Sequence, residues 1–444
     1  MPTQIETAIE RVVRYPDDNS RKIEAAKILL ANGAADFGNL IKIQSALEHS
    51  AIIDCPTIYT VLKSREQELL GKLPTVVDNA IRQYRRGFVY GITTATGDFL
   101  KNHENLFNAH PIQKLHLLID SAAEFQEILN KECLKKIKHL VIDCRDFPIL
   151  PIMAVSENQN LQQLEKLELI LSKNSANSNA TTNILDKLPN VTSLGIDILP
   201  YNETVLESAW QSDFFRNERL TQRLKAIRFH SGPISVNVLE PFYNNQGNSA
   251  LEFLSFDVNL YDFNWVFITN SNKISKFKAL HSPKGMNYNQ VHLVLYARSY
   301  KLQHLCLDSV ADDILHKAIC KSGMGEPLQT LLLSGSNIND ISLKRIKPTW
   351  PCGNLITAGF SGMISAVGVE NILRMKSPKL QTLLINSPFV TKDEVREILP
   401  KYRDKFPNLS AVYVNPCNGY RETDNQPERF PHSLWYRLVA REYF

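Results

Sequence analysis

A short pattern of apolar residues, Leu-x-x-Leu-x-Leu with conservative replacements, returns along most of the chain. Its fourth residue recurs at intervals of 25–33 residues, with a mean of 27. The twelve copies are centred on Leu115, Leu140, Leu167, Leu194, Ile227, Leu254, Leu280, Leu305, Leu331, Ala358, Leu383 and Val412. Random apolar clustering would not hold this spacing over twelve copies. The 444 residues therefore predict a repeat array rather than one compact core.

The spacing within each copy predicts what a repeat looks like. Alternate residues of a strand point to opposite faces, so the two apolar residues of Leu-x-Leu face the core and the residue between them faces outward. One repeat cannot bury its apolar face alone, but stacked neighbours share a core. About 27 residues leave room for a strand and a returning helix. Residues 180–190 and 392–406 are expected to be two of these helices.

The fold class that follows is an α/β solenoid shaped as a horseshoe, with parallel strands on the concave wall and helices on the convex side. It is expected to span residues 87–415 in about 12–13 repeats. Residues 87–92 read as a first strand and 97–110 as its crossover helix. Residues 1–86 lack the pattern and read as helices that cap the N-terminal end. Residues 416–444 are too aromatic for a free tail, and are expected to cap the last repeat.

The array resembles leucine-rich-repeat proteins, and residues 7–118 resemble the repeat-companion domain that precedes such repeats in some bacterial proteins. The residues that match the companion domain are Pro16, Asp17, Asp18, Gly33, Ile41 and Gln44. Two departures stand out: FGNLIKIQ replaces the family's Arg-Ala-Glu-Phe-Ile element, and the usual Asn after each strand is replaced by Arg145, Ser336 or Pro388. The resemblance implies a bacterial protein without a defined activity. Similar proteins include virulence effectors that are injected into eukaryotic hosts.

Composition narrows the function. A net charge of +4 argues against a dedicated nucleic-acid binder. The N-terminus does not read as a secretory signal, and no run of 18 apolar residues could span a bilayer. The seven scattered cysteines form no CxxC pair and suit reduced thiols in a cytoplasm. Phosphate-loop, dinucleotide, HExxH and GxSxG motifs are missing from the sequence, so a monomeric non-enzyme without cofactor or metal is expected.

The outward strand positions form two columns, in which we expect the partner-binding site. The first column is the residue between the two inward apolar residues of each strand, and the second is the next outward position. We expect a protein partner to meet mixed charges first and small or apolar residues later along the wall. The charges could equally serve to keep a bare face solvated. The candidate partner-binding residues are His116, Asp143, Glu168, Asp197, Arg228, His230, Asp257, His281, Cys306, Asp308, Leu332, Leu384 and Tyr413.

Two other functions stay open from the sequence. Repeat horseshoes often serve as substrate receptors for ubiquitin ligases, which is an alternative within the binding class. The alternative of another class is a cysteine-dependent enzyme, in which Cys306 is the nucleophile and His281 its base, with Asp308 or Asp257 orienting the base. His304 lies on the same strand and is expected to face the same side as Cys306. A flat open wall would supply neither an oxyanion hole nor exclusion of water.

Overall fold

A computed structural model of the chain describes residues 81–85, 88–109, 112–144, 155, 158–172, 185–199, 218–230, 249–256, 275–282, 289, 291, 294, 302–308, 327–345, 353–375 and 377–414. The predicted helices of residues 1–80 and the predicted C-terminal cap lie outside these residues. The chain divides into two compact units, residues 1–141 and 142–444.

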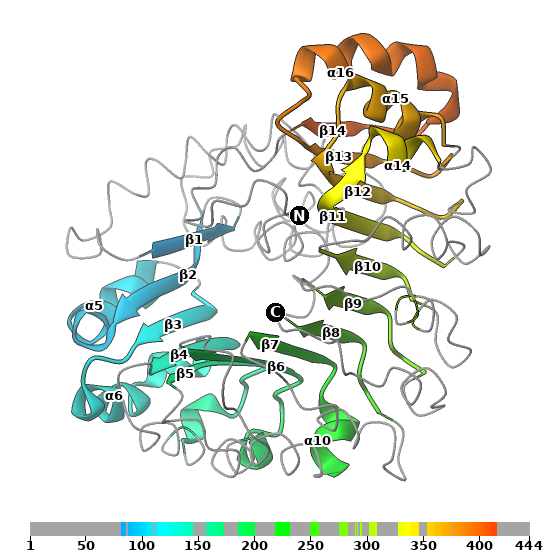
Figure 1. Cartoon of the computed structure of the whole chain (residues 1–444). Helices are drawn as coiled ribbons and strands as arrows, with labels where there is room; N and C mark the ends of the chain where they lie inside the picture. The colour runs from blue at the N-terminus through cyan, green and yellow to red at the C-terminus, as the bar shows by residue number, and fades with distance from the viewer. Residues whose placement is uncertain are drawn as a thin grey trace, which may run out of the picture. The chain divides into compact units, whose positions relative to one another are not determined.

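The described strands form one sheet in which every strand lies beside its neighbours in the sequence (Figure 1). From β2 onward, every pair whose register is described is parallel. The strands are β1 (Ile81–Arg85), β2 (Phe88–Ala95), β3 (Lys114–Leu118), β4 (His139–Cys144), β5 (Lys166–Ser172), β6 (Ser193–Leu199), β7 (Ala226–His230), β8 (Phe253–Phe256), β9 (Ala279–Ser282), β10 (His304–Leu307), β11 (Thr330–Asn339), β12 (Thr357–Met363), β13 (Thr382–Asn386) and β14 (Ala411–Val414).

The predicted repeat is confirmed at each of its twelve centres, which lie one by one in β3 to β14. The residues expected to face the core are buried: Leu331 and Leu333 of β11, for example, are both 0% exposed. The last centre differs, because Val412 of β14 is only half-buried. A long parallel sheet with this periodic burial is the arrangement of a repeat solenoid.

A regular set of backbone hydrogen bonds joins one repeat to the next. The carbonyl oxygen of Gln329, just before β11, accepts from Ile356 N at 2.8 Å and from Thr357 N at 2.9 Å. The Ile356 carbonyl does the same for Gln381 N and Thr382 N, at 2.9 and 3.0 Å. Equivalent pairs recur from Glu165 to Gln381. Because each carbonyl receives two N–H groups of the following repeat, the strands start at the same level.

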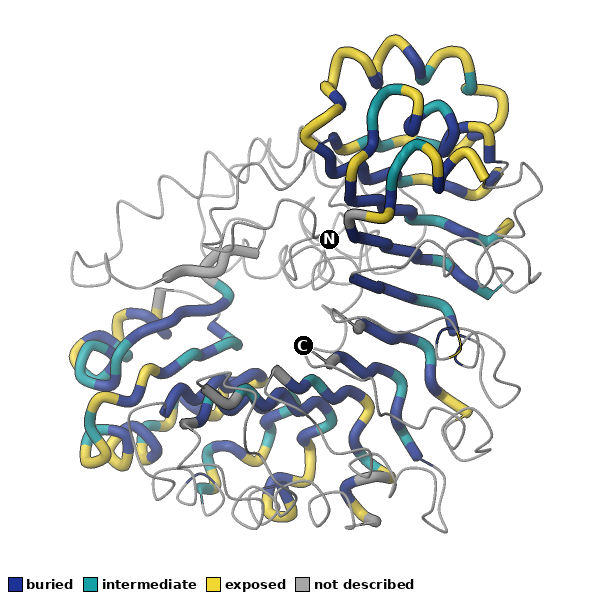
Figure 2. The backbone as a smooth tube through the Cα atoms, in the orientation of Figure 1, coloured by how far each residue is buried: buried dark blue, intermediate teal, exposed yellow. Residues whose placement is uncertain are grey.

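The described helices and 3₁₀ segments lie in the returns between strands. They are α5 (Thr96–Ala109), α6 (Ala122–Leu129), η3 (Glu132–Lys136), η4 (Gln159–Leu161), α10 (Glu218–Arg223), α14 (Asp340–Lys344), α15 (Ala366–Leu373), α16 (Lys392–Ile398) and η7 (Leu399–Lys405). Exposed and buried residues alternate along these helices (Figure 2). None of the described helices has the length and apolar character needed to cross a bilayer.

Side-chain caps fix where the C-terminal helices begin. Asn339, Ser365 and Thr391 each accept a hydrogen bond from a backbone N–H in the first turn of α14, α15 and α16. Thr391 and Glu394 form a reciprocal capping box. Such caps satisfy donors that the helix itself leaves unpaired, and they let short helices start at a defined residue.

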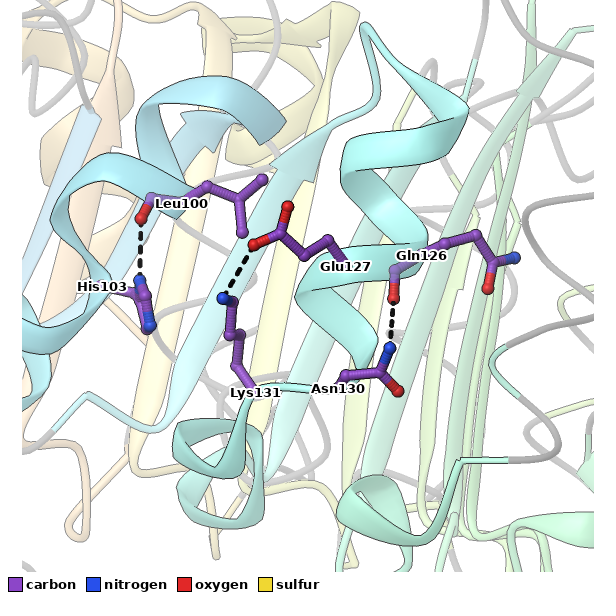
Figure 3. A network of polar contacts seen from close by, with 6 residues as sticks. All are labelled: Leu100, His103, Gln126, Glu127, Asn130 and Lys131. Atoms are coloured by element: carbon purple, nitrogen blue, oxygen red, sulfur yellow. Dashed lines mark hydrogen bonds and ion pairs between the residues drawn. The ribbon is translucent and has the colours of Figure 1, made fainter.

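In the first unit, α5 and α6 pack beside the strands through Phe99, Phe125 and Ile128, which are 0% exposed. Their surface carries local contacts (Figure 3): Lys131 Nζ lies 2.8 Å from a Glu127 carboxylate oxygen, and His103 Nδ1 lies 2.9 Å from the Leu100 carbonyl. These contacts join residues three or four apart on the helix surface, and each contributes little to stability.

The structure corrects the predicted boundary at residue 86. Residues 81–85 were expected to be helical, but they form β1, which pairs antiparallel with β2. The register places Arg85 opposite Phe88, so two residues, one of them Gly87, connect the strands. A two-residue connection containing glycine is typical of a hairpin, and this long-range pairing outweighs the local helical pattern. The predicted first strand therefore begins at Phe88 and continues to Ala95.

The predicted helix over 392–406 is present as two segments. Pro400 has no N–H to donate, so the α-helix α16 ends at Ile398 and the 3₁₀ segment η7 continues to Lys405. In the predicted helix over 180–190, residues 185–187 are helical and residues 180–184 lie outside the described part.

The loops that lack the usual asparagine use other side chains. After β13, the buried Ser387 hydroxyl donates to the Ile364 carbonyl at 2.8 Å and accepts from Ile364 N at 3.0 Å. It also accepts from Phe389 N at 3.2 Å. Ser387 therefore satisfies backbone groups of its own loop and of the preceding repeat, which is what a buried loop requires.

Candidate functional site

The first column is continuous over ten strands of the second unit. The pairing register places one residue of each strand, from β5 to β14, opposite the next. The aligned residues are Glu168, Gly195, Arg228, Ser255, His281, Cys306, Leu332, Gly359, Leu384 and Tyr413. Hydrogen bonds between consecutive strands therefore align in one column residues that lie as much as 245 positions apart in the sequence.

The expectation that this column faces solvent is wrong over its central strands. The buried members, all 2% exposed or less, are Ser255, His281, Cys306, Leu332 and Leu384. The same strands bury their leucine face, so the sheet is covered on both faces here. Tyr413 on β14 is 49% exposed, and the Arg228 side chain on β7 is 17% exposed. Glu168 on β5 is buried as well, so Arg228 and Tyr413 are the members of this column that reach solvent.

Arg228 forms an ion pair with Glu168 across the strand that separates them. Arg228 Nη2 contacts Glu168 Oε2, although β6 lies between β5 and β7. The intervening column residue is Gly195, and a Cβ at this position would lie 3.0 Å from Glu168 Cγ and 3.4 Å from Arg228 Nη2. The missing side chain leaves the space through which the two charges meet. The Glu168 side chain is 7% exposed, so the pair is well shielded from water.

The second column is polar and buried from Asp308 to Asn386, whereas Asp197 on β6 is half-buried. Asp308 accepts a hydrogen bond from the Ser334 hydroxyl, and Asn386 Nδ2 donates to Ser361 Oγ at 2.9 Å. Asp143, the second residue of the second unit in the sequence, is 5% exposed. The backbone of His230 pairs opposite Asp197. Asp257 lies outside the described residues.

In the first unit, the predicted column residue His116 contacts a neighbouring strand. Its Nδ1 lies 3.3 Å from Thr93 Oγ1, and the two residues are opposite each other in β3 and β2. His116 is half-buried.

The structure places the residues of the suggested cysteine nucleophile together but does not activate them. Cys306 and His281 are opposite in register, yet His281 Nδ1 lies 2.8 Å from Ser255 Oγ. Burial and the neighbouring Asp308 raise the pKa of the Cys306 thiol well above its usual value. His304 contacts Thr330 Oγ1 at 3.1 Å, and burial, with Lys278 nearby, lowers its pKa to about 4. A protonated thiol beside neutral His304 is a poor nucleophile.

A second surface feature was missed by the sequence patterns. Four large apolar side chains remain 47–68% exposed where strands turn into helices of successive repeats: Ile341, Met363, Val367 and Phe389. We call them the apolar edge cluster. Met363 and Phe389 each precede a helix cap by two residues, and Ile341 and Val367 each follow one by two. Aligning the repeats on their caps would have revealed this periodicity.

The described residues contain no group of three or more His, Cys, Asp or Glu side chains that could hold a metal ion. No protein-family description matches the chain, and no curated protein is similar to it in sequence. Among solved structures, a protein from Bacteroides fragilis is similar over 66% of this chain and 69% of its own, at 13% identity. Its TM-score is 0.33, which assigns neither a fold nor a function.

Proposed function

We propose that the chain is a non-enzymatic scaffold of the leucine-rich-repeat type that binds a protein partner along its first column. The observation that carries this proposal is the alignment of one residue from each of ten consecutive strands. With strands about 4.8 Å apart, the column is roughly 43 Å long. Its accessible members, Arg228 on β7 and Tyr413 on β14, are seven strand spacings or roughly 34 Å apart, which suits a protein or peptide better than a small metabolite.

The chemistry of the column favours binding over catalysis. Its polar side chains are engaged with one another, as in the contacts of His281 with Ser255 and of Arg228 with Glu168. The thiol of Cys306 is held protonated by burial and by Asp308, which raise its pKa. Paired, buried polar groups stabilise a sheet and define its register, whereas a nucleophile needs an activated and reachable atom.

The accessible column residues indicate where the partner makes contact. Arg228 offers a guanidinium beside Glu168, and Tyr413 offers an aromatic ring that is 49% exposed. Arginine and tyrosine are the residue types on which binding energy concentrates in protein interfaces. We therefore assign the charged contact to β7 and the aromatic contact to β14.

The test is affinity capture with a variant and a matched control. The variant is Tyr413→Ala, at the exposed end of the column, and the control is Tyr402→Ala on η7. The control removes the same residue type away from the column. A partner captured by the wild type and the control, but lost with the variant, supports the proposal. Equal capture by all three contradicts it, and a further loss with Ile341→Ser and Val367→Ser would move the site to the apolar edge cluster.

Two finer parts of the proposal rest on sequence resemblance. The first is that the chain comes from a bacterium, where it is either cytoplasmic or translocated into a host cell. In the host cell it would act as an effector by binding a host protein. The second, an alternative, is that the scaffold presents substrates to a ubiquitin ligase. Co-purification with ligase components from eukaryotic lysate separates the second from the first.

A further inference from the structure

Most of the large apolar side chains that stay exposed gather in the apolar edge cluster. In the part of the chain that the structure describes, six large apolar residues are 37–68% exposed, and four of them belong to this cluster. They lie where β11 leads into α14, β12 into α15 and β13 into α16 (Figure 1). A single exposed apolar residue needs no explanation, but a group on adjacent repeats indicates a contact surface.

Hydrogen bonds hold these three connections in place relative to one another. Asp340, in the first connection, accepts from Ser365 N at 2.9 Å and from Ser365 Oγ at 2.5 Å in the middle one. Ser387 joins the third connection to the middle one through the N–H and the carbonyl of Ile364. The cluster therefore rests on an ordered support. A surface that is already ordered loses little conformational entropy when it binds.

The residues that directly follow the three helix caps carry a charge pattern that complements itself. They are Asp340 in the first connection, Ala366 in the middle one and Lys392 in the third. A two-fold axis through the middle connection would place the first connection of one copy opposite the third connection of another. Asp340 would then face Lys392 of the second copy, and the opposite charges favour this arrangement. Asp393, which follows Lys392, is already paired with Arg396 at 3.0 Å.

We propose that a second copy of this chain docks on the apolar edge cluster about such a two-fold axis, so that the protein forms a reversible homodimer. Met363 and Val367, on the middle connection, would pack against the same residues of the second copy. This dimer replaces the monomer expected from the sequence. It is independent of the proposed function, because the cluster shares no residue with the first column.

The exposed area of the cluster matches a weak dimer. At 47–68% exposure, its four side chains offer roughly 400 Å² of apolar surface per copy. A two-fold contact uses this area twice, and the exposed neighbours Asn337, Pro388 and Lys392 bring the total to about 1,000–1,200 Å². Transient specific interfaces have this size, whereas obligate dimers bury about 2,000 Å² or more. The dissociation constant is therefore expected in the micromolar range.

Sedimentation equilibrium of the full-length chain tests for the dimer. Between about 1 and 100 µM, the average mass of the wild type is expected to rise from one chain toward two. Ile341→Ser combined with Val367→Ser should raise the dissociation constant at least about tenfold, because it removes two of the four cluster side chains. Serine is compatible with the first turn of a helix, so α14 and α15 are retained. The matched control, Leu118→Ser, removes an exposed apolar residue of β3 and should leave association unchanged.

The mass measurements can overturn the proposal in three ways. It fails if the wild type stays monomeric up to about 100 µM. It also fails if Leu118→Ser weakens association as much as the cluster variant does. Assembly beyond two chains would overturn it as well, because a two-fold contact closes at two copies and a head-to-tail contact does not.

A mixing experiment tests the two-fold axis itself. Val367→Asp and Val367→Lys each place like charges opposite each other in a two-fold dimer. Either variant alone should therefore be monomeric at the concentration at which half of the wild type is dimeric. An equal mixture pairs opposite charges and should recover the dimer, whereas a mixture that stays monomeric would contradict the proposal. Neither experiment includes another protein, so the dimer and the proposed function are tested separately.

Discussion

Arg228 and Glu168 lie two strands apart, yet their charged groups touch, because the residue between them in the column is Gly195. They are 60 positions apart in the sequence. The pair connects three consecutive repeats through one contact. It is shielded from water, so its loss should affect the stability of the second unit and not merely its surface.

Gly195→Ala is expected to destabilise the protein by about 1–2 kcal/mol, since the new methyl group would lie 3.0 Å from Glu168 Cγ and force the pair apart. Urea unfolding followed by circular dichroism measures this change. The matched control is Gly353→Ala, where a Cβ meets no atom within 4 Å. Equal stability of the two variants would show that Gly195 has no role in the ion pair.

Removal of one partner of the pair should cost more than removal of both. Glu168→Gln or Arg228→Gln alone leaves an opposite charge shielded from water, and each is expected to lower the free energy of unfolding by about 3 kcal/mol. The double variant removes both charges and should lose less than either single variant, and therefore far less than the sum of the single losses. Strict additivity in this double-mutant cycle would mean that the two side chains do not interact.

Asp340 is expected to hold α14 and α15 together. Its carboxylate accepts from Ser365 N at 2.9 Å and from Ser365 Oγ at 2.5 Å, and so orients the cap of α15. Asp340→Ala should lower stability by about 1–3 kcal/mol and speed hydrogen exchange in α15. The comparison is Asp393→Ala, which breaks an exposed ion pair with Arg396 and should change stability by under about 0.5 kcal/mol. Similar losses in both variants would argue against this role.

The lowered pKa of His304 predicts that the folded protein loses stability in acid. Burial, and secondly Lys278, lowers its folded pKa from 6.5 to about 4. An unfolded chain binds the proton more readily, so the contribution of His304 is complete above pH 6.5 and is lost as the pH falls toward 4. Urea unfolding at pH 7.5 and 4.5 should show a smaller difference for His304→Gln than for the wild type. An identical difference would mean that another group controls this pH range.

The sequence predicted the strands well, because each Leu-x-Leu encodes its own alternation of faces. It predicted poorly the features that depend on residues far apart in the sequence, such as burial of the outward positions and contacts between strands. Leu332, for example, is 0% exposed on the face where the alternation of its strand alone predicts an open position. The partnership of Arg228 with Glu168 depends on Gly195 between them, and a glycine in an otherwise filled column was its available signal. Residues 81–85 carry a local helical pattern, but they form a strand because they pair with β2.

The most direct test of the binding account is the footprint of the captured partner, measured by hydrogen exchange of the full-length chain with and without it. The account predicts slower exchange at the column strands, beginning with β7 at Arg228 and β14 at Tyr413. It predicts unchanged exchange in α5 and α6. Protection confined to α14, α15 and the loop at Phe389, with β7 and β14 unaffected, would contradict the column as the binding site and assign binding to the apolar edge cluster.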